Sequence, residues 1–255
     1  MYTLSSNGCA FEKINRRKIL KKVVLAALSI FNISFASENH AWKIHGELSY
    51  VKTSGNSDIE TFATKVEAKK DAFINRYNAK AEFLYGKADD KENTNKLYLL
   101  GRWERLFSKR AFGFIQGDYL RDKFSGYDYR SVLGAGIGYD ILKSKKHYLK
   151  GLASLGYAFE DMKDKGTDDF MSGKLEMNYI WNVRENLRFK EDLDYLQSFK
   201  DKTVYYINST TGLEVKINAH FSLGVAYKVN YQHRPPTVGI KKTDTTFLTS
   251  LVFDF

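Results

Sequence analysis

Cysteine and proline are almost absent from this sequence. The single cysteine, Cys9, lies within the first 36 of the 255 residues, so the rest of the chain has no disulfide bond and no cysteine-based metal site. The two prolines, Pro235 and Pro236, are adjacent. Because proline cannot donate to a strand ladder, a chain this poor in proline suits long β-strands.

Long hydrophobic runs are missing as well. The run VVLAALSIFNISFA at 23–36 has 14 residues, fewer than the roughly 20 that a membrane-spanning helix needs. It follows the basic segment KINRRKILKK (13–22) and ends with Ser34 and Ala36 at the positions that signal peptidase reads. We therefore expect residues 1–36 to be a cleaved signal peptide and residues 37–255 to form one mature domain.

A strong excess of positive charge is also missing once this signal is set aside. The whole chain has a formal net charge of +10. Residues 1–36 contain six basic residues and one acidic residue, so their removal lowers the net charge to +5. Half of the net positive charge therefore lies in the predicted signal peptide, and we expect no nucleic-acid partner.

Aromatic residues and strict alternation are what the sequence does have. Aromatics make up 15% of the chain, with 17 Tyr and 18 Phe. In FSLGVAYKVNY (221–231), the residues Phe221, Leu223, Val225, Tyr227 and Val229 alternate with smaller or polar residues. A period of two is typical of a β-strand with two different faces, and no window shows a convincing helical stripe.

About twelve such segments follow one another from Trp42 to the end of the chain. Most have ten or more residues, above the usual length of about five or six and close to the nine to eleven that a tilted membrane-spanning strand needs. No linker or repeat divides them. We expect strands at 42–53, 58–70, 74–86, 95–107, 111–123, 127–141, 147–160, 170–183, 187–198, 204–217, 221–231 and 244–255.

The connections between these segments alternate in character. DAFIN, FSKR, KSKK, REN and NAH are tight, whereas KADDKENT, EDMKDKGTDD and YQHRPPTVGIKKTD are long and polar. Short turns at one end and long loops at the other are typical of outer-membrane barrels. The sequence therefore predicts a single antiparallel up-and-down transmembrane β-barrel with short periplasmic turns, longer extracellular loops, and both termini in the periplasm of a Gram-negative bacterium. A soluble sandwich is the alternative, because alternation alone does not say which face is outside.

The chain ends in TFLTSLVFDF, an alternating strand with Phe253 and Phe255 on one face. The last strand must pair with the first to close a barrel. This ending resembles the terminal signature of Gram-negative outer-membrane proteins, which implies recognition by the barrel-assembly machinery.

Three stretches resemble the family of salt-induced outer membrane proteins, whose activity is not established. They are GELSYVKTSGNSDIETF, the segment DYLRDKFSGYDYRSVLGAGIGYDIL and the C-terminal strand. The middle stretch, with Asp118, Asp122, Phe124, Arg130 and glycines 134, 136 and 138, is the most specific. Ser57 departs from the Thr that the family usually has after the Gly-Asn turn. The resemblance implies an outer-membrane barrel and supplies no catalytic residue.

No residue pattern predicts catalysis, a cofactor or a metal ion. Of the five histidines, only His45 lies within a strand, and Ser49 on the same face would be roughly 13 Å away, too far for a nucleophile–base hydrogen bond. The acidic loop EDMKDKGTDDF has carboxylates that suit Ca²⁺, but it lacks EF-hand spacing and Lys163 and Lys165 interrupt it. We expect a solvated loop there. Basic residues Arg234, Lys241 and Lys242 suit lipopolysaccharide phosphates.

The polar faces of the strands carry charges of both signs, which we expect to line the lumen. The candidates are Lys80, Glu82, Arg102, Glu104, Lys174, Glu176, Arg188, Lys190, Asp192, Asp194, Glu214, Lys216 and Lys228. Such charges either line a water path or pair across it and block it. The leading hypothesis is a narrow passive channel for small solutes or ions. A plugged structural or stress-response barrel is the second, and a lipid-modifying enzyme a distant third.

Aromatic rings near the strand ends suit the interfacial girdles of such barrels, where they contact outer-membrane lipid and lipopolysaccharide. The candidates are Trp42, Tyr77, Tyr148, Tyr179 and Trp181.

Overall fold

The computed structural model describes residues 42–53, 58–163, 165–237 and 239–255, which form twelve β-strands. The strands are β1 (Lys43–Thr53), β2 (Ile59–Ala72), β3 (Asn75–Ala88), β4 (Lys91–Leu106), β5 (Ala111–Asp122), β6 (Tyr127–Lys143), β7 (His147–Met162), β8 (Gly166–Arg184), β9 (Leu187–Ser198), β10 (Tyr205–Lys216), β11 (Phe221–Gln232) and β12 (Thr243–Asp254). Each lies within a few residues of its predicted position. The predicted signal peptide, residues 1–36, falls outside the described residues.

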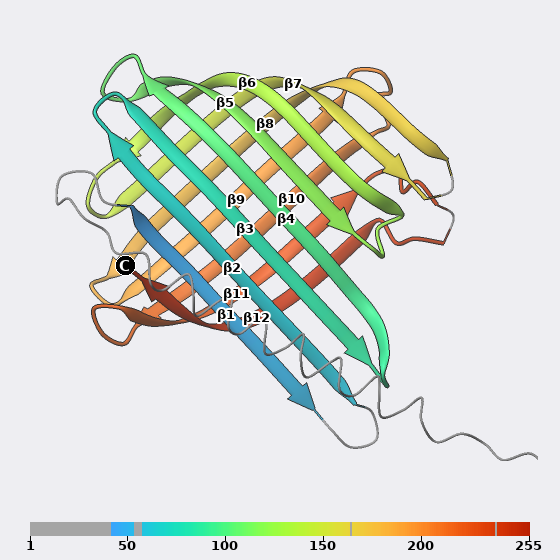
Figure 1. Cartoon of the computed structure of the whole chain (residues 1–255). Coiled ribbons are helices and arrows are strands. Elements are labelled where there is room, and N and C mark those ends of the chain that lie inside the picture. Colours follow the sequence, from blue (N-terminus) through green and yellow to red (C-terminus); the bar gives the residue numbers. More distant parts are fainter. Residues whose placement is uncertain (1–41, 54–57, 164, 238) are drawn as a thin grey trace, which may run out of the picture. The chain divides into compact units, whose positions relative to one another are not determined.

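The strands form one closed antiparallel barrel, as the sequence predicts. Each strand pairs with its neighbours in the sequence, and β1 pairs with β12 to complete the ring. The strands cross the barrel at a tilt, and the C-terminus lies at the end where the short turns are (Figure 1). In the described ranges, no helix has the length and hydropathy needed to cross a membrane.

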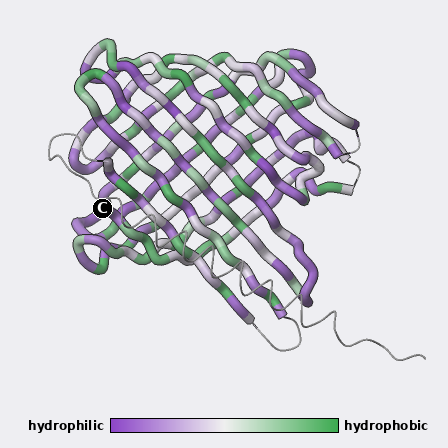
Figure 2. The backbone as a smooth tube through the Cα atoms, in the orientation of Figure 1, coloured by the Kyte–Doolittle hydropathy of each residue, from purple (hydrophilic) through white to green (hydrophobic). Residues whose placement is uncertain are grey.

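Alternation along each strand separates an apolar outer face from a polar interior. Leu133, Ile137 and Leu155 are more than half exposed on the outside of β6 and β7. Asp140 and Ser172, by contrast, point inward and are fully buried. The alternation of hydrophobic and hydrophilic residues is visible along the strands in Figure 2. This sense is the reverse of a soluble sandwich and fits a barrel surrounded by lipid.

Two of the predicted long loops are shorter than expected. Strand β3 extends to Ala88 and β4 begins at Lys91, so only Asp89 and Asp90 form the turn. Their φ angles are positive, at 47° and 60° respectively. The acidic segment is likewise mostly strand, because β7 extends to Met162 and β8 begins at Gly166. Their polar composition predicts loops. A charged strand extension is nevertheless stable because its side chains pair across the ladder, as Lys87 and Glu60 do in an ion pair of 2.9 Å.

The inward glycines of β6 allow close packing inside the wall. A Cβ atom at Gly138 would lie 2.2 Å from the ring of Phe112, and one at Gly136 would lie 2.1 Å from the carbonyl oxygen of Ala153. A larger side chain at either position would force the wall to move. The glycines therefore relieve crowding within the wall.

Candidate functional site

The lumen is the candidate functional site, and the charged residues proposed for it line its two cavities. All thirteen candidates are found there: Lys80, Glu82, Arg102, Glu104, Lys174, Glu176, Arg188, Lys190, Asp192, Asp194, Glu214, Lys216 and Lys228. Alternation places each of them on the inner face. Only barrel closure decides which of them meet across the lumen.

The larger cavity, here called the vestibule, has a volume of about 1000 Å³ and lies toward the short-turn end. The smaller cavity, here called the upper pocket, has a volume of about 160 Å³ and lies toward the long-loop end. Six residues line both cavities: Lys65, Lys80, Tyr98, Lys174, Asp192 and Asp194. The two cavities therefore meet at one charged layer in the middle of the barrel.

A buried ion network joins four strands beside the vestibule. The Glu104 side chain on β4 is 3% exposed and forms ion pairs with Arg76 Nε of β3 at 2.9 Å and with Lys150 Nζ of β7 at 2.5 Å. Arg76 also reaches the buried Asp140 of β6 at 3.2 Å. Arg76 and Lys150 both lie over the ring of Phe112, at 4.4 and 5.0 Å from its centroid. Every charge in this network therefore has an opposite partner, as buried charges require.

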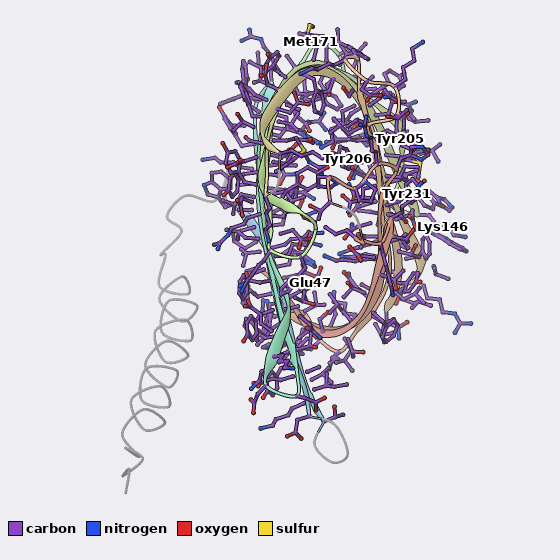
Figure 3. All side chains as sticks on the ribbon, turned by 90° about the vertical axis from the view of Figure 1, so that its right-hand side faces the viewer. Glu47, Lys146, Met171, Tyr205, Tyr206 and Tyr231 are labelled. Carbon is purple, nitrogen blue, oxygen red and sulfur yellow. The ribbon has the colours of Figure 1, made fainter. Side chains whose placement is uncertain are left out.

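Ion pairs also cross the lumen at the middle layer and just beside it, in the upper pocket. Lys228 Nζ of β11 lies 2.5 Å from Glu82 of β3, and Lys174 Nζ of β8 lies 3.1 Å from Asp118 of β5. These strands are not neighbours in the sheet. Figure 3 shows side chains filling the space between the two long walls of a flattened ring. The pairs narrow the passage between the vestibule and the upper pocket.

An aromatic and apolar cluster closes one side of the lumen near the long-loop end. Tyr127 and Tyr206 share a hydrogen bond of 2.6 Å, and Tyr206 donates one of 2.8 Å to Glu160. The guanidinium of Arg130 lies 3.9 Å from the centroid of the Tyr206 ring. Val132, Ala158, Phe170 and Leu196 complete the buried cluster. The free cross-section is therefore smaller at this end than in the vestibule.

One group of side chains in the vestibule wall has the composition of a metal site. His45, Glu47 and Glu214 present ligand atoms within 4.8 Å of one another. His45 Nε2 lies 3.0 Å from Glu47, and its Nδ1 lies 2.7 Å from Asp254. Lys65, however, already binds the same Glu47 oxygen at 2.8 Å. Lys190 likewise pairs with Glu214. The carboxylates are neutralised by lysines, so this group is better described as an ion network.

His45 and Ser49, the two residues considered for a nucleophile–base pair, have other surroundings in the barrel. Both ring nitrogens of His45 face carboxylates, and Ser49 Oγ is buried without a hydrogen bond in the described part of the chain. A Ser–His pair is therefore not formed between these two residues.

Among the described residues, the carboxylates of the acidic segment at the long-loop end do not form a common site for a cation. Glu160 is buried in the lumen with Tyr206, whereas Asp168 pairs with Lys200. The remaining acidic residues include Asp169, which accepts a hydrogen bond from Tyr157, and Asp164, which falls outside the described residues. The carboxylates are thus divided among different partners.

A second loop contact involves a residue proposed for lipopolysaccharide. Arg234 pairs with Asp201 in the loop between β9 and β10. Hydrogen bonds from the Thr203 hydroxyl and backbone N–H, followed by Arg234, hold the pKa of Asp201 below its usual value. Lys241 and Lys242 are exposed. Contact of these basic residues with lipopolysaccharide remains a prediction.

Four of the five predicted girdle residues lie on the outer face, and one does not. Trp42 has Lys70 Nζ 5.7 Å from its ring, Tyr77 is 40% exposed, and Tyr179 and Trp181 stack on His147. Tyr148 was wrongly placed in the girdle. It points into the vestibule and donates a 3.0 Å hydrogen bond to Asp140. Leu155 of the same strand is 61% exposed, so the odd-numbered residues of β7 face outward and the alternation puts Tyr148 inside.

The C-terminal residues take part in barrel closure. Ile44 and Phe255 exchange two backbone hydrogen bonds of 2.8 and 2.9 Å. The ring of Phe253 packs against Phe221, and that of Phe255 against His220, both at 5.5 Å. Their role as an assembly signal remains a prediction.

Several lumen residues were not identified from the sequence. They include Lys65, Arg76, Asp118, Asp140 and Lys150, all of which form ion pairs inside the barrel. The same alternation that predicted the others would have found them. Asp140, for example, continues the inward glycine row of β6, and Arg76 lies four residues before Lys80 on β3.

Comparisons with known proteins give a family and distant relatives. The uncharacterised protein YdiY of Escherichia coli (strain K12) is 28% identical over 164 residues, and the alignment covers 64% of each chain. The chain thus spans less than two thirds of that relative. Among solved structures, the NanC porin is similar at 9% identity, covering 84% of this chain and 98% of that one, with a TM-score of 0.48.

An outer membrane channel from Pseudomonas putida F1 is similar at 10% identity, covering 87% of this chain and 97% of that one, also with a TM-score of 0.48. The family model described as a protein of unknown function, DUF481, matches residues 46–255. The matched range includes all or part of every strand of the barrel, from within β1 to the last residue. The chain therefore belongs to the DUF481 family.

Proposed function

We propose that this protein is an outer-membrane barrel that passes small ions, anions in preference to cations, through its charged lumen. The observation that carries the proposal is the vestibule, which meets the upper pocket at the charged middle layer. A strongly apolar outer face supports a place in lipid, since soluble proteins rarely expose large apolar surfaces. The predicted signal peptide supports secretion to the outer membrane.

The preference for anions follows from the balance of charge in the vestibule wall. Thirteen Lys or Arg residues line it, against nine Asp or Glu residues. Rings of charged side chains set the selectivity of wide pores, and an excess of four positive charges attracts anions. At about 0.1 M salt the screening length is near 10 Å, comparable to the distances inside such a lumen, so the preference should be strongest at low salt.

A planar-bilayer recording tests this proposal. The full chain is expressed, purified from outer membranes and checked for folding by a heat-dependent gel shift. We expect discrete conductance steps that grow with salt concentration and a reversal potential in a salt gradient that favours anions.

Charge reversal provides the matched comparison. Lys216→Glu changes a residue that lines the vestibule, whereas Lys146→Glu makes the same change in an exposed turn outside the lining. We expect the reversal potential to move toward cations in the first variant only. An equal shift in both would mean that the lumen does not set selectivity.

The second candidate is a non-conducting structural barrel. It is favoured by the ion pairs that cross the lumen, such as Lys228 with Glu82 and Arg102 with Glu176. A protein that is folded by gel shift but silent in the bilayer would support this candidate. A conducting protein would show that these pairs leave a path for ions.

A further inference from the structure

The seam where the barrel closes is much shorter than every other strand pairing. β1 pairs with β12 over four residues, His45–Leu48 with Leu251–Asp254, whereas the other ladders contain between ten and sixteen pairs. β1 nevertheless continues to Thr53, and β12 begins at Thr243. The two strands lie together near the short-turn end and diverge toward the long-loop end (Figure 1).

The divergence exposes groups that a closed wall would cover. By alternation Val51 belongs to the inner face of β1, with Glu47 and Ser49, yet it is 46% exposed. Within the described ranges, the backbone of β1 beyond Leu48 has no strand partner in β12, and unpaired backbone groups are costly in hydrocarbon. An opening of this kind in a membrane barrel therefore needs something to occupy it.

The upper pocket lies directly behind this opening. Ser49 of β1 and Leu248 and Ser250 of β12 line it. If the ladder continued in register past Leu48 and Leu251, Ser49 would face Ser250 and Val51 would face Leu248. The pocket therefore borders the seam on its inner side, where Ser49 and Ser250 are buried, and it also meets the vestibule.

The lining of the upper pocket is amphipathic. Leu84, Leu120 and Leu248 supply apolar surface, and charged side chains of both signs supply the polar part. Its volume of about 160 Å³ is below the 300–1000 Å³ of typical ligand sites. It accommodates one end of a chain molecule and leaves the rest in the opening.

Six Lys or Arg residues line this pocket, against five Asp or Glu residues. Lys80 and Lys228 share one carboxylate, Glu82, at 2.8 and 2.5 Å. An additional anionic group near these two ammonium groups would complete the charge balance.

A third ammonium group lies on the same side of the pocket. The closest partner of Lys96 is the neutral amide oxygen of Asn230 at 2.9 Å, and the carboxylate of Asp122 is farther away at 3.5 Å. The pocket therefore suits a ligand with a negatively charged head.

We propose that the β1–β12 seam is a lateral gate, through which a single-chain anionic amphipath of the fatty-acid type enters the upper pocket from the bilayer. Its carboxylate binds beside Lys96 and Lys228, and its chain lies between the diverging strands. The proposal rests on the membrane location proposed above but not on ion conduction, which is measured without any amphipath.

Binding of 11-(dansylamino)undecanoic acid tests the gate. The probe is added to vesicles containing the full-length protein, in a Cys9→Ser background, and to empty vesicles. We expect saturable binding above the empty vesicles, and at least a tenfold loss of affinity in Lys228→Met. The control Lys216→Met removes a lysine from the vestibule but not from the upper pocket, and should bind the probe as the parent does.

A reversible cross-link tests the route itself. In Val51→Cys/Leu248→Cys, oxidation joins the two strands, and we expect probe binding to be lost on oxidation and restored by reductant in the same folded sample. Equal binding in both states, equal losses in both lysine variants, or no saturable binding would overturn the proposal. Disulfide-linked dimers of the single variant Leu248→Cys would instead identify a second copy as the occupant of the seam. If the cysteines do not cross-link, the lysine comparison decides.

Discussion

Removing the charge of Glu104 is the perturbation whose effect can be worked out most directly from the structure. Glu104 is buried and faces Lys150 at 2.5 Å and Arg76 at 2.9 Å. Glu104→Gln keeps the shape of the side chain and removes its charge. Arg76 retains Asp140, but Lys150, only 13% exposed, loses its one ion-pair partner among the described residues.

Breaking a buried ion pair from one side typically costs about 3–5 kcal/mol. Because Lys150 keeps some contact with the water of the vestibule, we take the lower limit of about 3 kcal/mol. With a factor of ten for each 1.4 kcal/mol, this lowers the folding equilibrium constant more than about 100-fold. The free energy of unfolding is measured by urea titration of the barrel in vesicles, with the gel shift as the readout.

The matched double variant separates the charge effect from a general loss of structure. Glu104→Gln/Lys150→Met removes both charges, and replacing a whole buried pair is often nearly neutral. We expect it to unfold within about 1 kcal/mol of the parent. A single variant as stable as the parent, or a double variant less stable than the single, would refute the view that Lys150 depends on Glu104.

Three further predictions concern the lipid face, the vestibule and the terminus. Val225 is 39% exposed on the outer face, so Val225→Asp should cost up to about 2 kcal/mol and reduce the folded fraction measured by gel shift. Ala226→Asp, on the inner face, should be tolerated. The reverse result would mean that the assignment of the two faces is inverted. Tyr148→Phe removes the hydrogen bond to the buried Asp140 and should lower the unfolding free energy by about 1–3 kcal/mol in the same titration, and an unchanged value would place Tyr148 outside. Deleting Phe255 should reduce the amount of barrel recovered from outer membranes, and normal recovery would remove its role as an assembly signal.

The sequence by itself determined the strands and their two faces. Twelve strands and one closed antiparallel barrel were predicted from the period of two, the near absence of proline and the lengths of the segments. These three patterns depend only on residues that are near one another along the chain. The charges that the sequence predicts for the lumen by alternation are among the residues that line the two cavities. It misjudged local phase in one place, Tyr148, and it took charged strand extensions such as the one ending at Ala88 for loops.

Tertiary structure decided everything that depends on residues far apart in the sequence. Lys228 and Glu82 are 146 positions apart and meet only because β11 and β3 face each other across the lumen. The shared partners of the buried network and the sizes of the two cavities follow from this closure. The four-residue seam is likewise a property of how β1 and β12 meet, since both strands are long enough in sequence to pair over a greater length. Alternation specifies which way a side chain points, and closure of the ring specifies what it finds there.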